Sequence, residues 1–203
     1  MQEHDVPDWY IHSCEKIKYM FPKAHAVAYV MMAYRIAWYK VYYPLAYYAA
    51  YFAIRASAFS YETMCGGKER LKSFLRPLRE RYNNEKTKRQ MTNLEKDTYR
   101  DMRLVEEMYA RGFDFIPIDL YKVQAHRFRI EENRLMPSLD SIEGLGEKAA
   151  ESIVQAAAEG PFLSRDDFRR RTKVGKTMVD KLGDLGILKD LPETDQISIM
   201  DLL

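Results

Sequence analysis

The longest apolar stretch of the chain covers residues 24–54, and it sets the strongest limit on the fold. Polar or charged residues interrupt it at three positions and Pro44 breaks it, so it does not fit a membrane span. Over residues 24–40, apolar residues recur every three or four positions, which predicts a helix buried on one broad face. Pro44 suits the first turn of a second helix that runs to Arg55.

The composition indicates one or two globular domains, because 47% of the 203 residues are hydrophobic and 31% are charged. Cys14 and Cys65 lie far apart in the sequence and only four histidines are present, which favours neither a disulfide framework nor a structural zinc site. A reduced intracellular protein is the simpler interpretation. The net charge of +2 argues against a uniformly basic surface but leaves local basic patches open.

One such basic patch is concentrated in residues 68–103, which carry 12 Lys and Arg against 6 Asp and Glu. Apolar spacing predicts a short helix in the first part of this segment, broken at Pro77. Thr92 and Glu95 have the spacing of a capping box, and the helix that follows is expected to end at Gly112.

The periodicity changes after residue 112. Residues 115–120 and 127–130 alternate and are rich in β-branched or aromatic side chains, which predicts two or three short strands with a turn near 131–133. We therefore expect a mainly α fold with a small β element (α+β). The expected parts are a helical region (1–112), a β connector (113–137), a region of short helices (138–190) and a tail (191–203).

The motif with the clearest mechanism begins at Ile142, where the sequence reads Ile-Glu-Gly-Leu-Gly-Glu-Lys-Ala-Ala. Gly144 and Gly146, separated by Leu145, permit a tight turn whose amides face outward beside a helix N-terminus, and Lys148 follows in that helix. This pattern is typical of a helix-hairpin-helix that binds duplex DNA phosphates without reading bases. The alternative is a plain connection between two helices.

A second, weaker copy of the motif is expected about thirty residues later, at residues 174–179. In this copy Gly175, Lys176 and Thr177 are the candidate DNA-binding residues, with Lys176 in place of the second glycine. The sequence therefore predicts tandem hairpins.

Together these residues resemble the C-terminal portion of Gram-positive PolC-type DNA polymerase III alpha subunits, within the bacterial C-family polymerases. The resemblance runs end to end. Its most specific part is residues 16–29, Lys-Ile-Lys-Tyr-Met-Phe-Pro-Lys-Ala-His-Ala-Val-Ala-Tyr, followed by Ala-Trp-Tyr-Lys at 37–40 and by Pro44. This sequence is similar to the family's fingers signature, and the Gly144 hairpin falls where the family carries its tandem helix-hairpin-helix module.

The resemblance implies that the fingers helices deliver basic side chains to the triphosphate of the incoming nucleotide. The positions carried over are Lys18, Lys23 and His25, with Arg35. Positive groups aimed at the leaving pyrophosphate would stabilise the charge that develops there. Without the surrounding signature, Lys23 would be an ordinary solvated residue and His25 a structural histidine.

The last residues resemble the family's short sliding-clamp binding sequence, in which Gln196 anchors one end and apolar residues fill a pocket. The matching residues are Gln196, Ile197, Ser198, Ile199 and Met200. Met200 departs from the family pattern, which favours Phe at this position. An ordinary frayed tail is the alternative.

No Asp-x-Asp pair of the kind that holds polymerase metals occurs in the sequence, so we expect the catalytic carboxylates and their Mg²⁺ to lie outside this chain, which alone should not synthesise DNA. The resemblance implies four partners: duplex primer-template DNA, the incoming dNTP, the sliding clamp and the polymerase palm. It also implies a bacterial cytoplasmic location at the nucleoid and replisome, with no membrane partner.

Two other interpretations stay open at this point. The chain could be a stand-alone, non-catalytic helix-hairpin-helix module for DNA binding or repair scaffolding, which would explain residues 138–190 but not the signature at 18–44. The Met- and Tyr-rich helices within 24–59 could also form an interface for a protein partner.

Overall fold

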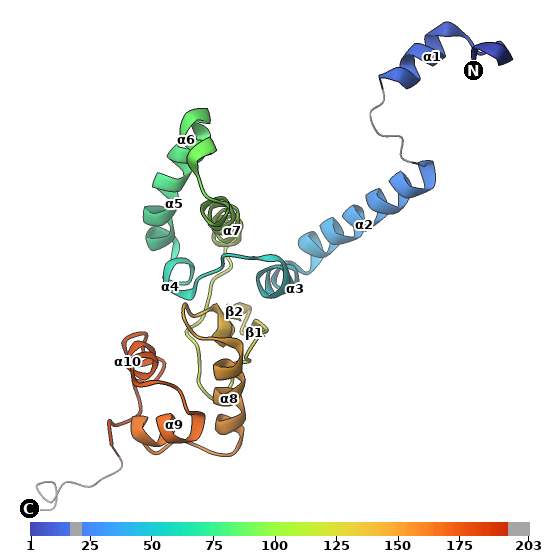
Figure 1. Cartoon of the computed structure of the whole chain (residues 1–203). Coiled ribbons are helices and arrows are strands. Elements are labelled where there is room, and N and C mark those ends of the chain that lie inside the picture. The colour runs from blue at the N-terminus through green and yellow to red at the C-terminus, as the bar shows by residue number, and fades with distance from the viewer. Residues whose placement is uncertain (17–21, 195–203) are drawn as a thin grey trace, which may run out of the picture. The chain divides into compact units, whose positions relative to one another are not determined.

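The computed structural model describes residues 1–16 and 22–194 (Figure 1). The chain divides into two compact units, residues 1–42 and residues 43–203. Helices dominate and one two-stranded antiparallel sheet accompanies them, which confirms the expected α fold with a small β element. Among the described helices, none has the length and apolar character needed to cross a bilayer.

The first unit contains a short 3₁₀ turn, η1 (Gln2–His4), and two α-helices, α1 (Asp8–Glu15) and α2 (Lys23–Tyr42). The predicted helix over 24–40 is therefore confirmed. The prediction that one face of this helix is buried is wrong, because none of the residues of α2 is buried. The physical reason lies in the unit itself, where the eight-residue α1 also buries none and so provides no packing partner.

The second unit begins with α3 (Pro44–Ala50), which starts at its proline as predicted and continues as one π-helical stretch, η2 (Tyr51–Arg55). The helices that follow are α4 (Tyr61–Met64), α5 (Lys68–Asn83), α6 (Glu85–Gln90) and α7 (Asn93–Ala110). Their shared core is aromatic and aliphatic, with Tyr48, Met64, Leu71, Val105 and Met108 fully buried.

Helix α5 does not break at Pro77, contrary to the sequence prediction. Leu71 and Leu75 are buried before the proline, and beyond it Arg79 pairs with Glu106 of α7 at 2.5 Å. These contacts hold both halves of α5 against α7, which offsets the backbone hydrogen bond that a proline removes. The predicted capping box at the start of α7 is confirmed, and the helix ends before Gly112, whose φ is +83°.

The sheet is a hairpin of β1 (Arg129–Glu131) and β2 (Arg134–Met136), in which Ile130 pairs with Leu135. The two turn residues between the strands both have positive φ. The predicted strand over 115–120 does not form, since only Phe115 makes a bridge, to Leu135. Its apolar side chains are buried instead in cores on both sides of the segment.

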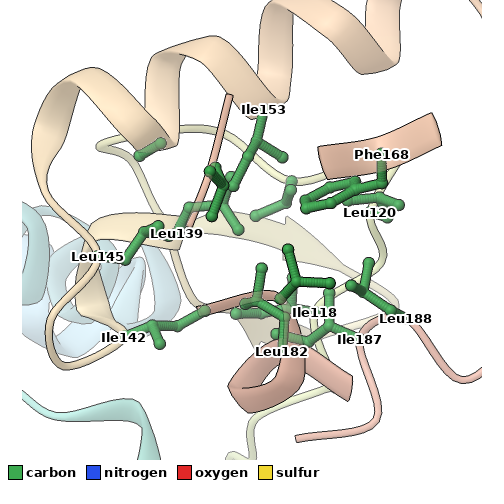
Figure 2. Close-up of a cluster of buried hydrophobic side chains, with 14 of the residues drawn as sticks. Ile118, Leu120, Leu139, Ile142, Leu145, Ile153, Phe168, Leu182, Ile187 and Leu188 are labelled. Atoms are coloured by element: carbon green, nitrogen blue, oxygen red, sulfur yellow. The ribbon is translucent and has the colours of Figure 1, made fainter. Parts of the chain in front are cut away.

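The remaining elements are the 3₁₀ turn η3 (Leu139–Ser141) and the helices α8 (Glu147–Ala158), α9 (Arg165–Thr172) and α10 (Lys176–Asp184). Figure 2 shows their core, in which Ile153 and Phe168 from the helices face Leu120 from the preceding loop. Polar contacts outside this core also fix the loop: His126 contacts Asp140 at 2.9 Å and Glu151 at 3.2 Å. Hydrogen bonds to these two carboxylates raise the pKa of His126.

Asp101 is a fully buried carboxylate in the middle of α7. Its Oδ2 accepts hydrogen bonds from the backbone amides of Ser57 and Ala58 at 3.1 and 3.0 Å. Its Oδ1 accepts a third from Arg100 at 3.2 Å. Asp101 therefore fixes the segment between η2 and α4 onto α7.

We expect Asp101→Ala to lower the free energy of unfolding by about 1–3 kcal/mol, because two backbone amides lose their acceptor. Asp101→Asn keeps one acceptor oxygen and should lose less. Asp97→Ala removes an exposed partner of Arg100 on the same helix and serves as the control. Urea unfolding of the three variants tests this expectation, and equal losses for Asp101→Ala and Asp97→Ala would contradict it.

Candidate nucleic-acid interface

The first hairpin joins η3 to α8 and is anchored by two buried side chains. Ile142 and Leu145 are 1% and 5% exposed, and the Leu145 amide donates to the Ile142 carbonyl at 3.1 Å. Between them Gly144 has φ +84°, a conformation that favours glycine. A Cβ on Gly144 would lie 3.4 Å from Met178 Cε, so α10 packs close to this turn.

The start of α8 presents unpaired backbone donors. Gly146 precedes the first helical residue and has no side chain to cap the helix. Within the described part of the chain, the amides of Gly146, Glu147 and Lys148 donate to no acceptor. No atom lies within 4 Å of a Cβ placed on Gly146, so the backbone there is open to solvent. Exposed amides at the positive end of a helix dipole form a favourable place for an oxyanion.

The second hairpin joins α9 to α10 and repeats this geometry. Lys173 has φ +57°, Val174 is 6% exposed, and Gly175 precedes the first residue of α10. The amides of Lys176 and Thr177 also lack acceptors among the residues described.

This geometry corrects the register expected from the sequence. Gly175 occupies the place of the second glycine, Gly146, and Lys173 the place of the first, Gly144. Lys176 is therefore the first helical residue and not a substitute for a glycine. The reason is that the buried Val174 must match Leu145 for the turn to close on the core.

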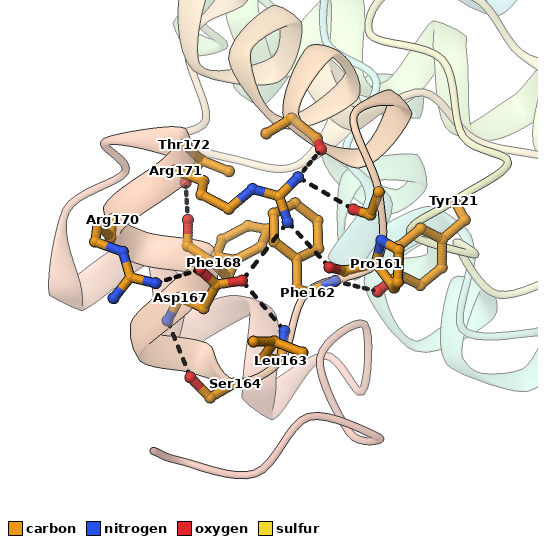
Figure 3. Close-up of polar contacts among 12 residues, drawn as sticks. Tyr121, Pro161, Phe162, Leu163, Ser164, Asp167, Phe168, Arg170, Arg171 and Thr172 are labelled. Carbon is orange, nitrogen blue, oxygen red and sulfur yellow. Dashed lines mark hydrogen bonds and ion pairs between the residues drawn. The ribbon is translucent and has the colours of Figure 1, made fainter. Parts of the chain in front are cut away.

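Helices α8 and α9 are held together around an arginine, as Figure 3 shows. Arg171 donates to the carbonyls of Ala156, near the end of α8, and of Gly160 and Pro161, just beyond it. Its guanidinium lies 4.4 Å from the centre of the Phe162 ring. Ser152 Oγ donates to the Thr172 carbonyl at 2.8 Å. Arg171 thus joins the end of α8 to α9.

A carboxylate from α4 holds the first hairpin from outside. Glu62 accepts from the Glu143 amide at 3.2 Å and pairs with Lys181 of α10 at 2.7 Å. Lys181 in turn donates to the Glu143 carbonyl at 2.5 Å. Burial is the largest single influence on Glu62 and raises its pKa, but the hydrogen bond and charge of Lys181 together with backbone hydrogen bonds outweigh it, and the pKa lies below its ordinary value.

The expected nucleotide-binding residues all belong to the first unit. Lys18 lies outside the described residues. Lys23 is the first residue of α2, and the ring centre of His25 lies 4.5 Å from that of Tyr29. Residues two apart on a helix do not face each other, and Arg35 follows Lys23 by about 18 Å along the axis. The structure therefore places Lys23, His25 and Arg35 on one helix without gathering them at one point.

The residues expected to bind a sliding clamp, Gln196 to Met200, lie outside the described residues as well. Across residues 1–16 and 22–194, no three His, Cys, Asp or Glu side chains are arranged to hold a metal ion. The described residues therefore do not fit a Mg²⁺ site.

Sequence reasoning missed Lys173, Glu62 and Lys181. Lys173 could have been found by aligning the two hairpins on their buried apolar residue and not on the glycines. Glu62 had no detectable signal, because it lies 81 positions before its hydrogen-bond partner Glu143.

The Glu62 contacts generate a prediction of pH-dependent stability. A carboxyl whose pKa is lower in the folded state stabilises the fold above its ordinary pKa of 4.5, and this contribution is lost as the pH falls through the folded value. Glu62→Gln should therefore reduce the free energy of unfolding by about 1–2 kcal/mol at neutral pH. The deficit should shrink in acid.

Urea unfolding across the pH range measures this difference. Glu69→Gln is the matched control, since Glu69 also pairs with a lysine, Lys72, but on an exposed surface. A Glu62→Gln deficit that stays constant from neutral to acid pH would show that the charge of Glu62 is not what stabilises the hairpin.

Comparison with known proteins extends these observations. A family described as "Helix-hairpin-helix motif" matches residues 112–196, which contain both hairpins. A protein named "DNA polymerase III PolC-type" from Streptococcus suis (strain 98HAH33) is 50% identical over 99% of the chain. Proteins of the same name from Streptococcus thermophilus (strain ATCC BAA-491 / LMD-9) and Streptococcus pyogenes are each 48% identical over 99% of the chain.

The chain spans 13–14% of the length of these relatives. The aligned region includes both the residues of the fingers-like signature and the hairpins, because it covers 99% of the 203 residues. This confirms the resemblance inferred from the sequence: the chain is homologous to a segment of the PolC-type DNA polymerase III proteins.

Proposed function

We propose that this chain acts within a replicative DNA polymerase, where it grips duplex DNA and positions the incoming nucleotide. The observation that carries the proposal is the pair of hairpins, each presenting unpaired amides at a helix N-terminus. The similarity to PolC-type polymerases supports it and extends over residues 1–111, which a stand-alone helix-hairpin-helix module would leave unexplained.

The hairpins bind phosphates of the primer-template duplex and read no bases, since their donors are backbone amides. Gly144, Gly146 and Gly175 let the DNA approach the backbone, while Ile142 and Leu145 act by anchoring the turn. Lys148, Lys176 and Thr177 are exposed in the first turns of α8 and α10 and add side-chain contacts beside the amides. Lys173, which occupies the place of Gly144 in the corrected register, is a further DNA-binding residue of the second hairpin.

The incoming dNTP is bound by α2 and the residues before it. Lys18, Lys23 and His25 contact the triphosphate, and Arg35 contacts a group farther along the helix. Their role is to stabilise charge that develops on the leaving pyrophosphate. The chemistry itself needs the palm and its Mg²⁺, which we assign to parts of the polymerase outside this chain, so the chain alone does not extend a primer.

One further partner follows from the same proposal. The sliding clamp binds Gln196, Ile197, Ser198, Ile199 and Met200. A methionine fills an apolar pocket with a flexible side chain and gives less rigid contact area than an aromatic ring. The site of action is the replisome in the bacterial cytoplasm.

The hairpins can be tested with a variant that leaves the fold intact. Aspartate is a good N-cap, so Gly146→Asp together with Gly175→Asp should preserve α8 and α10 while placing a carboxylate where a phosphate would bind. We expect the affinity of the 203-residue chain for a random duplex to fall about tenfold or more. Fluorescence anisotropy measures binding and circular dichroism measures the fold.

Asn84→Asp adds one negative charge, as each glycine substitution alone does, and is the control because Asn84 is an N-cap on α6, outside both hairpins. It should change duplex affinity by less than about twofold. A double variant that folds and still binds duplex like the parent would remove the hairpins from the DNA site.

The nucleotide site is tested in a complete PolC-type polymerase carrying this segment. Lys23→Ala should raise the KM for dNTP by about tenfold, since one charge-assisted contact to a phosphate is lost. Lys40→Ala changes a lysine at the other end of α2 and should leave KM unchanged. Steady-state primer extension gives both values, and an unchanged KM for Lys23→Ala would make Lys23 a solvated surface residue.

A further inference from the structure

A groove of about 1020 Å³ lies within the second unit, between α5, α6 and α7 on one side and the end of α3 on the other. All of its cationic residues lie in the basic segment 68–103, which is not part of either hairpin. Six cationic and three acidic side chains line it, together with four tyrosines. The groove is therefore both positively charged and aromatic.

Two cations of α7 are available for an anionic ligand. Lys96 and Arg103 line the groove, and neither forms an ion pair with a carboxylate of the described residues. They lie seven positions apart, which puts them on one face of the helix at a separation of about 10 Å. This spacing suits successive charges along an extended chain more than a single phosphate.

The tyrosines form two pairs from different parts of the chain. Tyr82 of α5 and Tyr99 of α7 are stacked, with ring centres 4.4 Å apart, and Lys88 Nζ lies 4.4 Å from the Tyr82 centre. Tyr47 and Tyr51, from α3 and η2, have ring centres 6.2 Å apart. Unpaired bases stack on aromatic rings, and cations beside those rings bind the phosphate backbone.

We propose that this groove binds single-stranded nucleic acid. Its cations follow the backbone, and the half-buried Tyr51 offers a stacking surface to a base. Tyr99 is buried and stacked on Tyr82, so this pair forms part of the groove wall. Duplex DNA fits less well because paired bases are stacked on each other and cannot reach the rings. An acidic polypeptide would satisfy the charges but would leave the rings unused. The proposal stands on the groove and does not depend on the hairpins.

The test uses the 203-residue chain and a labelled oligothymidylate of about 16 nucleotides, within the usual range of single-strand site sizes. Lys96→Glu with Arg103→Glu should weaken binding about tenfold or more and reduce the slope of log affinity against log salt by about 1.4. Tyr51→Leu should weaken binding about fivefold or more. Lys86→Glu with Arg89→Glu, on exposed positions outside the groove, is the charge-matched control and should stay within about twofold.

If the charge reversal disturbs the fold, Lys96→Gln with Arg103→Gln gives the same test with half the change in charge. A parent chain that does not bind the oligothymidylate, or groove variants that behave like the control, would overturn the proposal. So would an equal loss of duplex affinity in the groove variants, or competition by polyglutamate as strong as by unlabelled oligothymidylate. Gly146→Asp with Gly175→Asp should leave oligothymidylate binding unchanged, so a failure of the hairpin proposal appears in the duplex measurement alone.

Discussion

Burial of one apolar residue at the centre of each hairpin is the constraint on which the geometry of both turns depends. Leu145 and Val174 point into the core, which turns the flanking backbone outward and leaves the first amides of α8 and α10 without acceptors. Unpaired amides are costly when buried but cheap at a solvated helix start. The same packing that stabilises the region therefore creates the positions where phosphates can be bound, and no separate binding loop is needed.

The hairpins are also tied to the helices that precede them. Glu62 spans the distance between α4 and the first hairpin, with Lys181 bridging both. Asp101 likewise holds the segment before α4 onto α7. Each of these carboxylates links segments far apart in sequence. Side-chain charges, and not only the apolar cores, determine where the hairpin lies.

Local patterns in the sequence predicted the local structure. The capping box at Thr92, the helix start at Pro44 and the first hairpin could all be predicted, because each depends on residues within a few positions of one another. The predictions that were wrong depended on packing between residues that are far apart in the sequence. Pro77 stays helical because α7 supports both sides of it, and residues 115–120 are not a strand because neighbouring cores compete for their side chains. The Glu62 link needed the three-dimensional structure, because its partner lies 81 positions away in the sequence. The register at Lys173 needed an alignment of the two hairpins on their apolar residue and not on their glycines.

The small net charge of +2 is compatible with the two proposed nucleic-acid surfaces, because the two would bind by different physical interactions. Backbone amides bind phosphates through partial charges and need no excess of lysine or arginine, so the hairpin region can stay nearly neutral. A flexible single strand has no fixed array of phosphates, and its binding depends more on formal charge and on ring stacking. The chain accordingly concentrates its excess cations in residues 68–103, beside the tyrosines, and keeps the hairpins glycine-rich. The distribution of charge, and not its sum, distinguishes the two surfaces.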